Sequence, residues 1–138
     1  MARAGCQTEG VSDLDESAVL EEAIRLLSEA GARFAYLHGS RARGATQADS
    51  DIDVAAWFGE SAPQSYEMLL PAGVDLLVLD RAPLELAGRV AQHGRLLFSH
   101  DEVARVRWES TTRKIYFDEL PRITRAHREF SETVRRGR

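Results

Sequence analysis

The spacing of apolar positions predicts that regular structure begins with an amphipathic helix. Apolar residues from Leu20 to Ala30 repeat at helical spacing, and Gly31 supplies a stop signal. Ser12, with an aspartate three residues later, has the form of a capping box, so we expect the helix to start there. Residues 1–11 have no periodicity and are predicted to form a flexible N-terminal tail.

Four short segments farther along the chain have the pattern of β-strands. In residues 51–58, apolar residues alternate with a second set of residues that includes Asp51 and Asp53. This period of two is typical of a β-strand. The other three are short apolar or aromatic runs beside turn signals. The predicted strands are Arg33–His38, Asp51–Phe58, Val74–Leu79 and Arg95–Ser99.

Helical segments are predicted between and after these strands. Residues 59–73 read as a connection that holds one helical turn, and a helix follows from Pro83 to Gly94. The remainder predicts a C-terminal helix over about residues 101–135. Pro121 lacks the amide that a helix interior needs, so we expect a break or kink there.

Composition and charge narrow the class of protein. The chain has 138 residues, 43% of them hydrophobic and 29% charged, which is typical of one soluble domain, here residues 12–138. No apolar run is long enough for a membrane span, so we expect a cytoplasmic protein without a membrane partner. The net charge of −4 argues against direct nucleic-acid binding. Basic residues predominate from Val103 to Arg138, as a solvated helix face or as a docking surface.

Three aspartates and one glycine turn are candidates for chemistry. Asp51 and Asp53 fall on one face of a predicted strand, where two carboxylates suit a magnesium–nucleotide complex, although such pairs are also common in turns. Asp75 stands among apolar residues, where a charge is costly unless paired, or it is an edge-strand acid that faces water. Residues 39–44, Gly-Ser-Arg-Ala-Arg-Gly, form either a phosphate cradle or an ordinary turn.

The combination of these motifs resembles a known family. The segment His38–Gly44, followed five residues later by Ser50–Asp53, is similar to the signature of the DNA polymerase β type nucleotidyltransferase superfamily, and above all of the minimal nucleotidyltransferases of prokaryotes. The similarity covers roughly residues 13–100. It implies an α/β (α+β) fold, with a small mixed β-sheet flanked by helices and a C-terminal helical segment. His38 and Val54 depart slightly from the family pattern, and neither change removes a catalytic group.

The resemblance also implies site residues and cofactors. Asp51, Asp53 and Asp75 match the metal ligands, which would hold two Mg²⁺ ions about 3.5–4 Å apart, with ATP as substrate. Asp75 is the candidate to help deprotonate the acceptor. Gly39 and Ser40 match the phosphate-binding turn. Arg41 and Arg43 either add positive charge to this turn or form surface salt bridges.

The acceptor is suggested by the same resemblance. Small proteins of this type resemble the MNT antitoxin of HEPN/MNT toxin–antitoxin pairs, in which AMP is attached to a tyrosine of the partner HEPN ribonuclease, so a hetero-oligomer with a HEPN-type toxin or a homodimer is expected. Two alternatives stay open. One is a small-molecule, antibiotic-type nucleotidyltransferase, and the other is an antitoxin that neutralises its toxin by contact alone.

Overall fold

The computed structural model describes residues 3–39, 51–60 and 62–136. The order of elements agrees with the sequence prediction, and the first helix differs most in length. The elements are α1 (Arg3–Glu29), β1 (Phe34–His38), β2 (Ile52–Trp57), the 3-10 turn η2 (Ser65–Glu67), β3 (Val74–Val78), the 3-10 turn η3 (Leu79–Arg81), α2 (Leu84–His93), β4 (Arg95–Ser99) and α3 (Glu102–Arg136).

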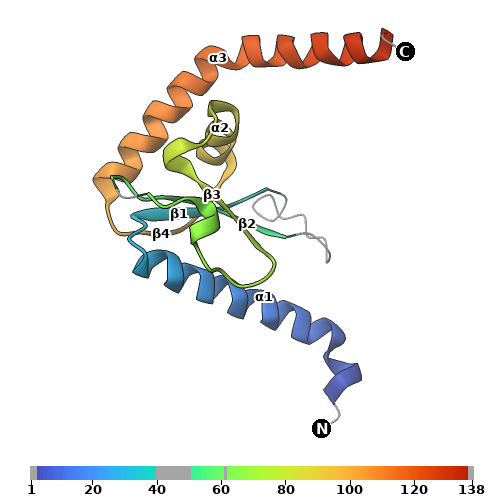
Figure 1. The fold of residues 1–138 in the computed structure, drawn as a ribbon, viewed down its shortest axis with the longest axis vertical. Helices are drawn as coiled ribbons and strands as arrows, with labels where there is room; N and C mark the ends of the chain where they lie inside the picture. Colours follow the sequence, from blue (N-terminus) through green and yellow to red (C-terminus); the bar gives the residue numbers. More distant parts are fainter. Residues whose placement is uncertain (1–2, 40–50, 61, 137–138) are drawn as a thin grey trace.

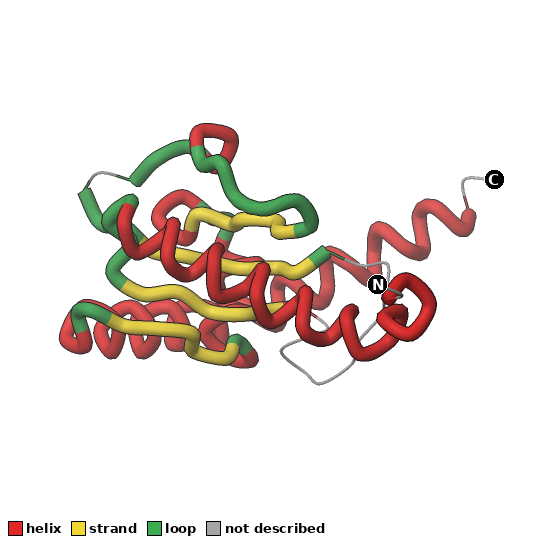
Figure 2. Tube along the Cα trace, turned by 90° about the horizontal axis from the view of Figure 1, so that it is seen from below, coloured by secondary structure: helices red, strands yellow, loops and turns green. Residues whose placement is uncertain are grey.

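The four strands form one mixed sheet in the order β3-β2-β1-β4. β1 pairs antiparallel with both β2 and β4, whereas β2 and β3 run parallel. α1 lies across one face of this sheet, and α2 and the first part of α3 cover the other face (Figures 1 and 2). The predicted fold class, a small mixed sheet flanked by helices, is therefore confirmed.

The alternation of strand residues creates a core on each face of the sheet. On the α1 side, Leu37 and Val54 pack with Leu27 of the helix, and all three are buried. On the opposite side, Phe34, Tyr36 and Ala55 pack with Val90 of α2. Burial of each large apolar side chain contributes about 1.5–3 kcal/mol, so these two cores hold the strands in their register.

Aromatic rings fill most of the second core. The ring of Phe34 stacks on Trp57 of β2, with centroids 5.2 Å apart. Trp108 of α3 lies 5.8 Å from Phe34 and 5.6 Å from Tyr36 in tilted arrangements. Such ring pairs add about 0.5–1.5 kcal/mol beyond their buried area. They fix the first turns of α3 against β1.

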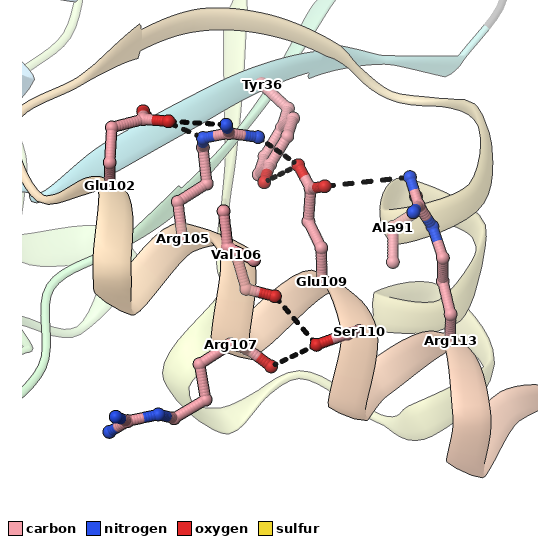
Figure 3. Close-up of polar contacts among 9 residues, drawn as sticks. All are labelled: Tyr36, Ala91, Glu102, Arg105, Val106, Arg107, Glu109, Ser110 and Arg113. Carbon is pink, nitrogen blue, oxygen red and sulfur yellow. Dashed lines mark hydrogen bonds and ion pairs between the residues drawn. The ribbon is translucent and has the colours of Figure 1, made fainter.

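A polar network strengthens the same junction (Figure 3). The Tyr36 hydroxyl donates a hydrogen bond of 2.6 Å to the carboxylate of Glu109 in α3. Arg105 binds the same carboxylate oxygen at 2.9 Å, and Arg113 approaches the other oxygen at 3.6 Å. Arg113 also donates to the carbonyl oxygen of Ala91 in α2 at 2.8 Å. This network joins β1, α2 and α3 through one carboxylate.

α2 and α3 approach each other closely at a glycine. A Cβ atom placed on Gly88 would overlap the side chain of Tyr116, so only glycine allows this contact. Beyond it, α3 leaves the body of the protein, and every residue from 124 to 135 is exposed. Figure 1 shows this last part of α3 extending away from the sheet.

The start of α1 differs from expectation, whereas the bend of α3 agrees with it. α1 begins at Arg3, so the predicted start at Ser12 is wrong for the backbone, and the capping pattern lies inside the helix. A serine or an aspartate inside a helix costs less than about 0.7 kcal/mol, which does not stop it. Pro121 lies within α3 and does not end it. The helix bends instead (Figure 1), as the kink alternative predicted.

Among the described residues, no helix has the length and apolar character needed to cross a membrane.

The Tyr36 hydroxyl is expected to couple stability to alkaline pH. Burial, with a further contribution from the hydrogen bond to Glu109, raises the pKa of Tyr36 above its ordinary value of 10.0. The unfolded chain then ionises first, so this part of the stability is present below about pH 10 and is lost above it. Tyr36→Phe should lower the free energy of unfolding by about 1–3 kcal/mol at about pH 8. It should also lose less stability than the parent protein when the pH rises above about 10. Urea unfolding measures both effects.

The matched control for this experiment is Tyr66→Phe, because the Tyr66 side chain is 80% exposed. That variant should unfold like the parent protein both at about pH 8 and above about pH 10. Equal stability of Tyr36→Phe and the parent at about pH 8 would contradict the anchoring role of the network.

Candidate active site

Three strand ends meet at one end of the sheet. β1 runs antiparallel to β2, so its last residue lies beside the beginning of β2, and β3 begins at the same end because it is parallel to β2. As a result, His38 pairs with Asp53, and Asp53 pairs with Asp75. Neighbouring strands lie about 4.8 Å apart. The three side chains therefore start from one row across the sheet.

The strand pleat decides which face this row occupies. Ile52 and Val54 are buried in the core beneath α1. Asp53 stands between them in sequence, so its side chain is directed to the opposite face, the side that α2 and α3 cover farther along the strands. Asp51 directly precedes β2 and its side chain is exposed. The second predicted ligand is thus placed in the row, and the first lies at the entrance to the same strand.

Asp75 is exposed on β3, an edge strand of the sheet. Its carboxylate can therefore be hydrated, and its apolar sequence neighbours do not require it to have a charge partner. What connects Asp75 with the site is its register with Asp53.

Gly39 directly follows His38, the last residue of β1. Its φ of +77° lies in the left-handed region that favours glycine. A Cβ atom at this position would stand 2.5 Å from Oδ2 of Asp53. Glycine is thus required twice here, by the backbone conformation and by the space that the Asp53 carboxylate occupies.

His38 is a member of the site that the sequence analysis did not single out as a candidate. Burial lowers the pKa of His38, and the nearby carboxylates of Asp53 and Asp75 act in the opposite direction. A lowered pKa keeps the imidazole neutral at pH 7. The available signal was the position of His38, the last residue of a predicted strand directly before the glycine turn.

Of the residues predicted to bind phosphate, Gly39 alone lies within the described part of the chain. Ser40, Arg41 and Arg43 lie outside the described residues, so their predicted roles stay predictions. Asp80 lies just after β3 and accepts hydrogen bonds from the amides of Phe58 at 2.9 Å and Gly59 at 2.7 Å. It therefore serves a structural purpose.

The chemistry of the carboxylates suits a magnesium site that a substrate completes. Within residues 3–39, 51–60 and 62–136, no group of three or more His, Cys, Asp or Glu side chains is arranged to hold a metal ion. Mg²⁺, however, commonly takes one or two carboxylates and completes its shell with waters and substrate phosphates. Asp53 and Asp75 offer two such carboxylates on adjacent strands. These residues thus fit a Mg²⁺ ion that is bound together with a nucleotide better than a Mg²⁺ ion that is held by protein side chains alone.

A family comparison identifies this arrangement. The sequence family described as "Polymerase beta, Nucleotidyltransferase" matches residues 21–103, which is more than half of the 138 residues. The chain belongs to this family. The matched region contains all four strands and the row of His38, Asp53 and Asp75. The resemblance inferred from the motifs is confirmed, as is the enzyme class, a nucleotidyltransferase.

Solved structures of similar fold come from toxin–antitoxin complexes. A toxin–antitoxin with AMP-PNP aligns at 24% identity and a TM-score of 0.59, over 78% of this chain and 97% of that chain. The MntA–HepT complex aligns at 22% identity and a TM-score of 0.55, over 80% and 98%. A complex of tri-AMPylated HEPN toxin with MNT antitoxin from Shewanella oneidensis aligns at 22% and 0.54, over 84% and 98%. No curated protein sequence matches the chain.

Substitution of Gly39 tests the geometry of the site. Gly39→Ala should lose about 1–2 kcal/mol of stability to left-handed strain, and should also displace the Asp53 carboxylate and weaken binding of Mg²⁺–ATP at least tenfold. Calorimetric titration with Mg²⁺–ATP, next to urea unfolding, measures both effects.

Gly31→Ala is the matched control, because Gly31 has a φ of +100° and nothing within 4 Å of a Cβ atom. It should show the strain without the loss of affinity. Unchanged affinity in Gly39→Ala would remove Gly39 and Asp53 from the nucleotide site.

Proposed function

We propose that this protein is a Mg²⁺-dependent adenylyltransferase that transfers AMP from ATP to a tyrosine hydroxyl of a partner HEPN-type ribonuclease toxin, and so acts as its antitoxin in the cytoplasm. The observation that carries the proposal is the register of Asp53 with Asp75 on adjacent strands, with Asp51 at the entrance to β2. Membership of the nucleotidyltransferase family supports the reaction class.

The chain's own residues have distinct tasks in this proposal. Asp51, Asp53 and Asp75 hold two Mg²⁺ ions, which when bound offset the triphosphate charge and polarise the acceptor hydroxyl. Gly39 leaves room for the Asp53 carboxylate, and its lack of a side chain lets the phosphates come close to the backbone. Ser40, Arg41 and Arg43 belong to the phosphate-binding turn. Asp75 accepts the proton of the acceptor hydroxyl, because it is the carboxylate on the open edge strand.

The covalent change is a substitution at the α-phosphorus of ATP. The acceptor oxygen forms a new bond to this phosphorus, and the bond between the phosphorus and the bridging oxygen of pyrophosphate breaks. Pyrophosphate leaves with that electron pair, and the hydroxyl proton passes to Asp75. AMP stays on the acceptor as a phosphodiester.

Two observations support a protein as the acceptor. The last part of α3 extends from the body and combines exposed Arg125 and Arg128 with Phe130, which is 70% exposed, and Val134, which is 47% exposed. An apolar patch edged by basic groups is typical of a protein docking surface. The solved structures of similar fold are toxin–antitoxin complexes, and one is described as containing a tri-AMPylated HEPN toxin.

Nucleotide binding should depend on a divalent ion. Three carboxylates near a triphosphate repel it unless a cation offsets the charge, so ATP should bind at least tenfold more weakly without Mg²⁺. The double variant Asp51→Asn/Asp53→Asn keeps side-chain size and removes the charge that holds the ion, so it should fold and lose the Mg²⁺ effect. Calorimetry with ATP, with and without Mg²⁺, measures this.

Asp80→Asn serves as the control in that titration, because Asp80 bonds to the amides of Phe58 and Gly59, away from the row of site residues. Its Mg²⁺ dependence should equal that of the parent. Equal ATP affinity of the parent protein in both conditions would refute the metal assignment.

The acceptor can be identified by mass. When the protein is co-expressed with a HEPN-type ribonuclease encoded by the neighbouring gene, the intact mass of that partner should rise by one or more AMP units. The folded double variant Asp51→Asn/Asp53→Asn should leave the partner unmodified and fail to protect cells in colony counts.

Two other outcomes would each favour one of the rival functions. An unmodified partner, together with efficient modification of a small hydroxylated compound, would favour a small-molecule nucleotidyltransferase. Full protection by the folded, transfer-dead double variant would show that contact alone neutralises the toxin.

A further inference from the structure

Within the described residues, the outer edge of β3 has no paired strand. The sheet of the described residues has the order β3-β2-β1-β4, so β3 pairs with β2 on one side only. An edge strand presents alternate N–H and C=O groups that can pair with another extended chain. Asp75 is the second residue of this strand, so the open edge begins at the candidate active site.

Two cavities adjoin along this edge. The first has a volume of about 190 Å³ and is lined by Asp75, Ser65 and Met68 among others. The second has a volume of about 160 Å³ and extends to Val78 and Arg81, with Gln64 on its outer side. Ser65 and Leu76 line both cavities, so the two form one groove between β3 and the segment 64–70.

Hydrogen bonds hold the segment 64–70, which forms the outer wall of the groove, in place. Arg81 donates to the carbonyl oxygens of Pro63 at 2.6 Å and Ala62 at 3.1 Å. The backbone amide of Gln64 donates to the carboxylate of Glu67 at 2.8 Å. This part of the described chain forms a 3-10 turn and no strand, so it flanks the edge of β3 without pairing with it.

The dimensions of the groove suit one extended segment. β3 has five residues, which at about 3.3 Å per residue gives an edge of about 17 Å. The cavity beside Asp75 is smaller than the roughly 300–1,000 Å³ that encloses a drug-sized ligand, yet exceeds the about 150 Å³ that accommodates benzene. It therefore has room for one ring-sized side chain.

We infer that the outer edge of β3 binds an extended segment of the acceptor protein as an added strand, which places a phenolic side chain in the cavity beside Asp75. Main-chain hydrogen bonds to β3 supply affinity, and the two cavities receive alternate side chains of the added strand. The hydroxyl then meets the α-phosphorus of ATP in the reaction described above. This inference rests on the proposed function, and it names how that function selects its acceptor.

Hydrogen exchange tests the added strand without catalysis. The protein, saturated with Mg²⁺ and AMP-PNP, is mixed with a pool of acetylated, amidated heptapeptides that carry a fixed central tyrosine. Those backbone amides of Val74–Val78 that point away from β2 should become protected at least tenfold, and a pool N-methylated at alternate positions should give no protection. Equal protection by both pools, protection by AMP-PNP alone, or no protection by either pool would overturn the inference.

A pair of variants tests the groove through kinetics. Gln64→Trp fills the cavity that is remote from Asp75, so it should raise the KM of the peptide pool at least tenfold and leave the KM of N-acetyltyrosinamide and of ATP unchanged. Leu69→Trp is the matched control, because Leu69 is 87% exposed and lines neither cavity. Equal KM values of Gln64→Trp and the parent for the peptide pool would contradict the groove.

The two experiments separate the inference from the proposed function. Protected β3 amides without transfer to any hydroxyl would refute the reaction and leave the docking edge standing. Transfer to N-acetyltyrosinamide with no peptide preference and no protection would leave the reaction standing and refute the docking edge.

Discussion

The register of β2 between its two neighbours is the constraint on which the site depends. β2 pairs antiparallel with β1 and parallel with β3, and these two pairings place His38, Asp53 and Asp75 in one row. Side chains alternate along a strand, so a slip of one residue would turn Asp53 into the core beneath α1 and expose Val54 instead. The chemistry of the protein is therefore maintained by the same burial that stabilises its sheet.

The two faces of the sheet contribute to this register in different ways. Beneath α1 the contacts are aliphatic, as between Leu27 and Val54, and they specify which strand residues point inward. On the other face, the rings of Phe34 and Trp108 and the bond between Tyr36 and Glu109 attach α3 to β1. The first turns of α3 are thus fixed to the sheet, whereas residues 124–135 at its far end are exposed.

Asp75 differs from the other residues of the row because its strand, β3, lies at the edge of the sheet. In the sheet of the described residues, His38 and Asp53 lie on inner strands, whereas Asp75 lies on an edge strand. In the proposed transfer, the nucleotide phosphates bind beside Gly39 and the acceptor approaches from the side of β3. One row of residues therefore separates the two substrates of the proposed transfer, with Asp75 on the side of the acceptor.

The sequence by itself determined the elements and the candidate chemistry, because both are written in local patterns. Period-two alternation located β2, turn residues located the ends of the strands, and the glycine motif with Asp51 and Asp53 indicated the family. Tertiary structure decided what depends on strand order: that Asp75 lies in register with Asp53, that it is exposed rather than buried, and that His38 joins the row. The tertiary structure also decided that β3 is an edge strand of the described sheet. Pairing between strands arises from contacts between residues distant in sequence, and no local pattern specifies which strand lies at the edge.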